Sequence, residues 1–107
     1  MINYGKQYLD KKDISAVVSV LKSDWLTQGP KVKEFENSLK NFFGAKYCSV
    51  VSNGTAALHL AVKAMGWKKG DYIFTTPNSF LATSNSILYV GAKPIFIDIR
   101  RDSYNID

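Results

Sequence analysis

The order of apolar segments after residue 46 limits this chain to a small number of folds. Strands are predicted at residues 47–51, 72–75 and 94–99, with helices at residues 56–65 and 80–90 between them. Strands that alternate with helices of this length form parallel βαβ crossovers, because a parallel neighbour needs a long connection across the sheet. We therefore expect an α/β fold with a mostly parallel sheet covered by helices on both faces.

Two helices are predicted before this alternating part. Asp10 is a good N-cap for the first. The apolar residues that follow it have helical spacing: Ile14, Val17, Val18 and Leu21. A second helix follows a Gly-Pro breaker and ends before Gly44, a residue suited to the left-handed position after a helix. The predicted organisation is a helical segment over residues 1–46 and the start of an α/β domain over residues 47–107.

The junction between the strand at residues 47–51 and the following helix has the features of an anion site. It consists of Ser52-Asn53-Gly54-Thr55. The first amides of a helix have no intrahelical acceptor and lie at the positive end of its dipole. Gly54 permits close backbone approach, and the Ser52 and Thr55 hydroxyls add donors, so a phosphate cradle is one interpretation. A simple capped helix start is the alternative that these residues leave open.

Charge and composition argue against several classes of function. The net charge is +5, but the basic residues occur as short scattered pairs, so we predict no nucleic-acid interface. No apolar run approaches membrane-spanning length, and the first residues do not form a signal peptide. The single cysteine, Cys48, permits no intrachain disulfide and is expected to be a buried, inert thiol. We expect a soluble cytoplasmic protein without a membrane partner, and we predict no metal site.

The end of the sequence predicts that the chain continues in a larger protein. Residues 102–107 have the pattern of a helix start, with Ile106 before an Asp107 cap, yet no helix follows. Three parallel strands would also leave an open apolar edge, which is a poor arrangement for an isolated domain. The 107 residues are therefore expected to be the N-terminal part of a longer chain.

Several motifs occur in a fixed order along the chain. They include Leu26-Thr27-Gln28-Gly29-Pro30, Ser52-Asn53-Gly54-Thr55-Ala56-Ala57-Leu58-His59-Leu60, Thr76-Pro77-Asn78-Ser79-Phe80-Leu81-Ala82-Thr83 and Gly91-Ala92-Lys93-Pro94-Ile95-Phe96-Ile97-Asp98-Ile99. Together they resemble the start of the DegT/DnrJ/EryC1/StrS family of sugar aminotransferases, which are fold-type-I enzymes that use pyridoxal 5′-phosphate (PLP). Within this family, the first residues and Thr75-Thr76-Pro77 look most like the UDP-4-amino-sugar aminotransferases of the pseudaminic-acid pathway.

The resemblance implies a cofactor site. Gly54, Thr55 and Ala56 match the family segment that binds the PLP phosphate through backbone amides and the threonine hydroxyl. Phe80 matches the aromatic residue that stacks on the pyridine ring. No catalytic residue is assigned within the chain, because the family's Schiff-base lysine and the carboxylate on the pyridine nitrogen both follow residue 107. The 107-residue chain alone is therefore predicted to be inactive.

The resemblance also implies substrates and partners. Enzymes of this family move an amino group, usually from glutamate, to a nucleotide-linked keto-sugar, and so supply amino-sugars for surface polysaccharides and glycans. Tyr4 and Thr27 match parts that line the sugar-nucleotide site near the interface of a homodimer. Some relatives replace the lysine with histidine and act as dehydratases. The further alternatives are a non-catalytic remnant or assembly module that keeps only the phosphate cradle, and an unrelated anion-binding α/β domain.

Two polar residues are tempting catalytic groups. His59 is the only histidine, but it lies in the middle of a predicted helix among apolar residues, so we expect a structural role. Asp98 ends a predicted strand, where α/β proteins gather ligands. It is nevertheless expected to be a capping or structural carboxylate.

Overall fold

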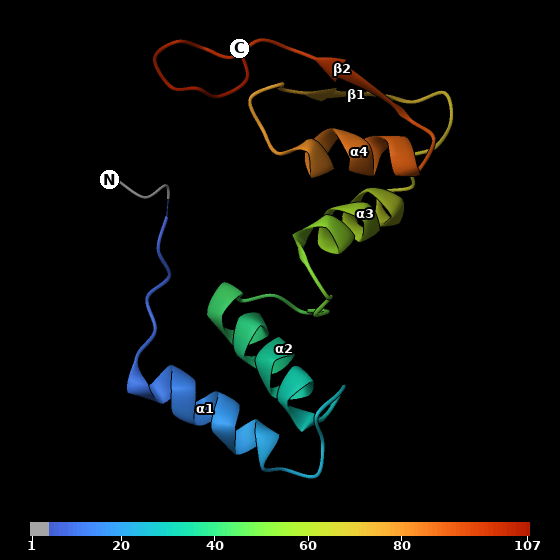
Figure 1. Ribbon diagram of the computed structural model, residues 1–107. Helices are drawn as coiled ribbons and strands as arrows, with labels where there is room; N and C mark the ends of the chain where they lie inside the picture. The colour runs from blue at the N-terminus through green and yellow to red at the C-terminus, as the bar shows by residue number, and fades with distance from the viewer. Residues whose placement is uncertain (1–4) are drawn as a thin grey trace. The chain divides into compact units, whose positions relative to one another are not determined.

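The computed structural model describes residues 5–107, which form two compact units. The first unit ends at Val50 and contains two helices, α1 (Lys11–Leu21) and α2 (Pro30–Phe43). The second unit, Val51–Asp107, contains two further helices and two strands (Figure 1). The division between the units lies after Val50, whereas the sequence predicts a boundary after residue 46.

The helix ends in the first unit follow local sequence signals. Asp10 accepts hydrogen bonds from the amides of Lys12 at 2.7 Å and Asp13 at 3.0 Å. The Asp13 carboxylate accepts in return from the Asp10 amide at 2.9 Å, which completes a capping box at the start of α1. α2 ends at Gly44, whose φ of 63° lies in the left-handed region that glycine adopts without strain. Both predicted helix ends are confirmed.

The second unit is a parallel βαβ arrangement with one additional helix. The chain forms α3 (Gly54–Ala64), β1 (Tyr72–Thr75), α4 (Leu81–Tyr89) and β2 (Lys93–Phe96). α4 is the crossover between the two strands; it packs on both of them and on α3, so it lies between α3 and the sheet (Figure 1). The strands pair in parallel, with Tyr72 opposite Lys93 and Thr75 opposite Phe96. The predicted parallel crossover is confirmed.

Residues 47–51, predicted as a strand, form no β-ladder. A strand requires the backbone of a neighbour, and none of the described residues pairs with this segment. Its Val50 amide instead donates to Glu36 Oε1 at 3.1 Å. Cys48 is half-buried rather than buried, because an extended segment without a neighbouring strand leaves part of the thiol accessible.

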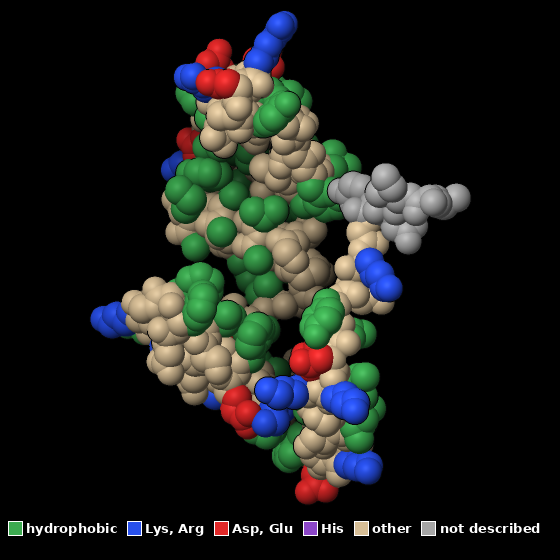
Figure 2. Space-filling view, turned by 90° about the vertical axis from the view of Figure 1, so that its left-hand side faces the viewer, with side chains coloured by type: hydrophobic (Ala, Val, Ile, Leu, Met, Phe, Trp, Pro, Cys, Tyr) green, Lys and Arg blue, Asp and Glu red, His purple; other side chains and the backbone are tan. Residues whose placement is uncertain are grey.

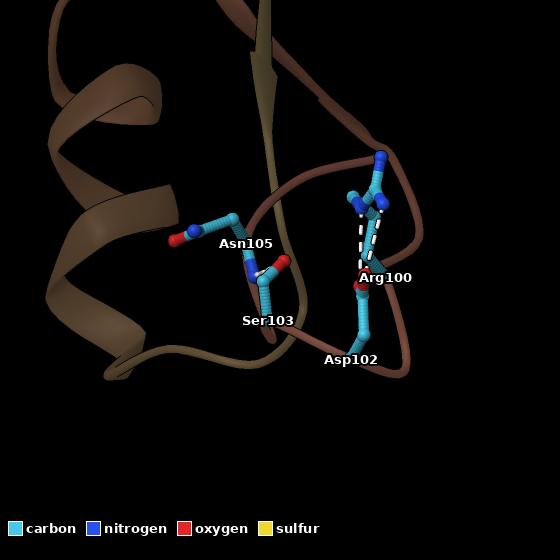
Figure 3. A network of polar contacts seen from close by, with 4 residues as sticks. All are labelled: Arg100, Asp102, Ser103 and Asn105. Atoms are coloured by element: carbon cyan, nitrogen blue, oxygen red, sulfur yellow. Dashed lines mark hydrogen bonds and ion pairs between the residues drawn. The ribbon is translucent and has the colours of Figure 1, made fainter.

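Residues 97–107 form a loop after β2. β2 ends at Phe96, and Ile99 forms an isolated antiparallel bridge with Ile106. The Asp107 amide donates to the Asp98 carbonyl at 2.9 Å. Figure 3 shows that Arg100 holds Asp102 through two hydrogen bonds of 2.9 and 3.1 Å. The hydrogen bond from the Arg100 guanidinium lowers the pKa of the exposed Asp102 carboxyl.

The buried core of the described residues is small and centres on α4. The fully or nearly buried residues are Val62, Thr75, Ala82, Ser86, Ile87 and Ala92. Ser86 is the most enclosed polar side chain, and its hydroxyl donates to the Thr83 carbonyl at 2.8 Å. This back-bond within the helix satisfies the hydroxyl, so α4 presents an otherwise small and apolar face to its neighbours.

Most large apolar side chains remain exposed, and Figure 2 shows them at the surface of each unit. They include Phe42 and Phe43 on α2, Leu60 on α3, and Tyr72 and Phe74 on β1. α3 is apolar around most of its surface, yet only Val62 is buried. Most of the apolar surface of α3 is therefore open among the described residues.

We expect the 107-residue chain, when expressed alone, to self-associate or aggregate. The physical reason is its exposed apolar surface together with a sheet of only two strands. Sedimentation velocity and urea unfolding would check this expectation. A monomer with a cooperative unfolding transition would contradict it.

Candidate functional site

The candidate site is built on the first turn of α3. Asn53 is the N-cap, with extended backbone angles of −167° and 170°. Its side-chain Oδ1 accepts from the Ala56 amide at 2.9 Å, and its carbonyl accepts from the Ala57 amide at 3.1 Å. The short polar side chain before an apolar helical segment thus fixes where the helix begins.

Two amides of this turn have no protein acceptor. Among residues 5–107, the Gly54 and Thr55 amides donate to no other group, and the Thr55 hydroxyl makes no hydrogen bond. A methyl group built on Gly54 would meet no atom within 4 Å, so the space beside this backbone is open. Unpaired amides at the positive end of a helix dipole are suited to an anion.

The Ala56 amide, unlike those of Gly54 and Thr55, has a protein acceptor. The sequence places Ala56 among the residues whose amides bind the phosphate. In the structure its amide is taken by the Asn53 cap, so the donors available at this turn are the Gly54 and Thr55 amides and the Thr55 hydroxyl. The capped-start and anion-site interpretations are therefore compatible, because the cap occupies one amide and leaves two.

A depression of about 560 Å³ adjoins these donors. It is lined by Gly54, Thr55, Ala57, Leu58, Ala61, Phe80 and Ala82. Because α3 packs on α4, Gly54 and Thr55 line the same depression as Phe80, although Phe80 is distant from them in sequence. Phe80 is the residue before α4, and 76% of it is exposed, so its ring is available to a ligand.

The apolar part of this lining is not predicted from the sequence. Ala57, Leu58 and Ala61 follow Gly54 at helical spacing, so the 3.6-residue period marks them as one face of α3. No lysine or arginine within the described part of the chain lines the depression. Attraction for an anion at this position therefore comes from amides, hydroxyl and helix dipole rather than from a cationic side chain.

Within residues 5–107, no other candidate residue from the sequence lines the depression. Thr27 is exposed in the loop between α1 and α2, in the first unit. Tyr4 lies outside the described residues. His59 does not line the depression, and its ring packs edge-on against Tyr89 with 5.2 Å between the ring centres. Asp98 Oδ1 accepts from the Ile99 amide at 2.7 Å, as a local turn carboxylate does.

Two further features are absent from the described residues. None of the helices there is long and apolar enough to cross a membrane. In residues 5–107, no three acidic, histidine or cysteine side chains are grouped as metal ligands require. The depression at the start of α3 is the candidate site, because it adjoins amide and hydroxyl donors that have no acceptor among the described residues.

The chain is similar to proteins of one known family. Residues 7–107 match the DegT/DnrJ/EryC1/StrS aminotransferase family. The UDP-4-amino-4,6-dideoxy-N-acetyl-beta-L-altrosamine transaminase of Campylobacter jejuni (serotype O:23/36) is 47% identical over 107 residues, which are 100% of this chain and 28% of that protein.

Solved structures show the same likeness. Helicobacter pylori PseC, described as an aminotransferase involved in the biosynthesis of pseudoaminic acid, is 40% identical with a TM-score of 0.89, over 98% of this chain and 29% of that one. The E. coli GDP-4-keto-6-deoxy-D-mannose-3-dehydratase with bound hydrated PLP is 34% identical with a TM-score of 0.89, over 100% of this chain and 30% of that one.

These likenesses confirm the fold class predicted from the sequence, the N-terminal part of a fold-type-I PLP-dependent transferase. The chain spans less than a third of the length of each of these relatives. The family match extends over nearly all of its residues, and both units are included in it. The chain belongs to the DegT/DnrJ/EryC1/StrS aminotransferase family.

Proposed function

We propose that the protein carrying this chain is a PLP-dependent aminotransferase that converts a nucleotide-linked keto-sugar into an amino-sugar. The observation that carries this proposal is the single depression in which the open Gly54 and Thr55 amides and the exposed Phe80 ring meet. A phosphate monoester attached to a flat aromatic ring needs this combination of anion donors and ring surface. The family membership supports the same conclusion.

The residues present fit the phosphate and ring ends of PLP. The Gly54 and Thr55 amides and the Thr55 hydroxyl would bind the phosphate, and the α3 dipole would favour its negative charge. Phe80 would stack on the pyridine ring and exclude water from one side of it. PLP, when bound, supplies the electron sink that lets an amino group move between two carbon atoms. The chain's own residues hold and orient the cofactor, and no proton-transfer group among residues 5–107 lines the depression.

The substrates and the assembly are part of the same proposal. The similar C. jejuni transaminase and H. pylori aminotransferase support a UDP-linked 4-keto-sugar as substrate and a role in surface glycan biosynthesis. We propose glutamate as amino donor, a homodimer as the assembly and the cytoplasm as the compartment. Tyr4 and Thr27 are proposed to contact the sugar nucleotide.

The proposal is tested on the complete reading frame that contains this chain. Purified protein is titrated with PLP, and the visible absorbance of protein-bound PLP is recorded. We expect a saturable band, lost when the lysine that binds PLP covalently is replaced by alanine. Amino transfer from glutamate to a UDP-linked 4-keto-sugar would then be followed by mass spectrometry. A protein that gives no visible band at saturating PLP would refute the proposal.

A sugar dehydratase is the second candidate. It is favoured by the likeness to the E. coli dehydratase with bound hydrated PLP, which extends over the whole chain. Both candidates need the same phosphate donors and the same aromatic ring, so the site described here serves either. The residue at the covalent position decides between them: lysine supports the aminotransferase, and histidine supports the dehydratase.

Phe80→Ala is expected to weaken PLP binding while leaving folding nearly unchanged. The ring is exposed in the described residues, so its removal costs little core packing, whereas the stacking surface for the pyridine ring is lost. Aromatic contacts of this kind contribute about 0.5–1.5 kcal/mol, which predicts a roughly twofold to tenfold weaker affinity.

Leu81→Ala is the matched control. Leu81 is the next residue, is similarly exposed and does not line the depression. PLP titration and thermal unfolding of both variants would be compared. Equal losses of PLP affinity in the two variants, or a loss explained entirely by a lower melting temperature, would restore a purely structural role for Phe80.

A further inference from the structure

We infer that Asn53 is a positioning residue that sets which amides bind the cofactor phosphate and keeps the cap free of charge. This inference rests on the proposed function, since it concerns the same phosphate site. Asn53 itself does not line the depression, so it acts through the first turn of α3. Two separate observations support it, the hydrogen-bond pattern of the turn and the distribution of charge at the helix starts.

The hydrogen bonds of Asn53 fix both ends of its side-chain amide. Oδ1 accepts from the Ala56 amide at 2.9 Å, and Nδ2 donates to Ser52 Oγ at 3.2 Å. The first bond holds the turn in helical geometry and withdraws Ala56 from the set of available donors. The Gly54 and Thr55 amides remain, and they adjoin the depression that also contains Phe80. The cap therefore decides that the phosphate is bound by two amides rather than three.

The charge at the start of α3 differs from that at the start of α1. α1 begins with an aspartate cap and a second aspartate in its first turn, as the helix dipole favours. α3 has a neutral cap and no acidic residue in its first turn. An aspartate at residue 53 would cap the helix equally well. It would also place a negative charge beside a phosphate that carries about −1.5 to −2. Neutrality at this position therefore leaves the dipole available to an external anion.

Asn53→Asp separates capping from charge, because the two side chains have nearly the same shape. The variant is made in the complete protein, freed of cofactor, and the dissociation constants for PLP and for pyridoxal, which lacks the phosphate, are measured. We expect PLP to bind at least about tenfold more weakly, through like-charge repulsion. Binding of pyridoxal and the melting temperature should be almost unchanged. Asp10→Asn, the reverse change at the cap of α1, should leave the affinity for PLP unchanged.

Asn53→Ala and Asn53→Ser test positioning without a charge. Alanine removes the cap, so the first turn of α3 is less firmly held in helical geometry and PLP should bind about fivefold more weakly. Serine keeps a neutral acceptor and should restore the affinity for PLP. If Asn53→Asp does not fold, these two variants still test whether Asn53 positions the donors that bind the phosphate.

The outcomes distinguish this inference from the proposed function. If wild-type protein binds PLP no more tightly than pyridoxal, the phosphate site and the proposed function fail together. If wild-type protein prefers PLP but Asn53→Asp keeps that preference, or loses affinity for PLP and pyridoxal equally, only the role of Asn53 is overturned. Equal PLP affinities in the alanine and serine variants would likewise overturn it.

Discussion

Replacing Ile87 with alanine is expected to destabilise the second unit by about 2–5 kcal/mol. Ile87 is 3% exposed and lies on the buried face of α4 with Ala82 and Ser86. This face packs between α3 and the two strands, so the lost methyl groups leave a cavity in the small core. Since few residues share this core, the neighbouring elements have little alternative packing with which to fill the space.

Hydrogen exchange measured on peptides from α4 and β1 of the complete protein would report this loss locally. Leu88→Ala provides the matched control, because it deletes a side chain of the same size at the adjacent position, which is 53% exposed. We expect the control to cost less than about 1 kcal/mol. Similar losses of protection in the two variants would mean that α4 does not bury the face described here.

Thr55→Val is expected to weaken PLP binding by about 1–3 kcal/mol, the cost of losing a hydrogen bond to a charged group. Valine has nearly the shape of threonine, so the substitution removes the hydroxyl and keeps the packing. In the described residues this hydroxyl has no hydrogen-bond partner, and Thr55 lines the depression together with Gly54 and Phe80. The expected change in affinity is roughly fivefold to 150-fold.

The affinity for PLP would be obtained by titrating cofactor-free protein and following its visible absorbance. Thr83→Val makes the same chemical change in the same unit, where the hydroxyl pairs with Ser79 Oγ at 2.9 Å and lies outside the depression. The control should bind PLP as wild type does. Wild-type affinity in Thr55→Val would remove the hydroxyl from the phosphate site and leave only the two amides there.

The successful predictions depend on interactions close together in sequence. The Asp10 capping box joins residues three apart, and the end of α2 needs one glycine in the left-handed region. The parallel pairing of β1 and β2 follows from a helix-length connection. Each of these features follows from a short stretch of sequence, which is why the pattern predicts it.

The predictions that are wrong or incomplete concern features that require contacts between residues distant in sequence. Residues 47–51 have the apolar, β-branched composition of a strand but lack a neighbouring backbone among the described residues. The lining at Leu58 and Ala61 was missed because a helical face becomes a site only when another element lies beside it. The Ala56 amide is a different case, because its acceptor Asn53 is only three residues away and the sequence did not assign the cap to one residue.

The sequence by itself determined the α/β order of elements, the helix start at Asp10, and the presence of amide and hydroxyl donors near residue 54. Local backbone geometry and short-range hydrogen bonds are sufficient to specify these features. Only the tertiary structure decided that Phe80 lies beside the start of α3. Phe80 reaches that position because α3 packs on α4, and burial of Val62, Ala82 and Ile87 stabilises an arrangement that no single segment encodes.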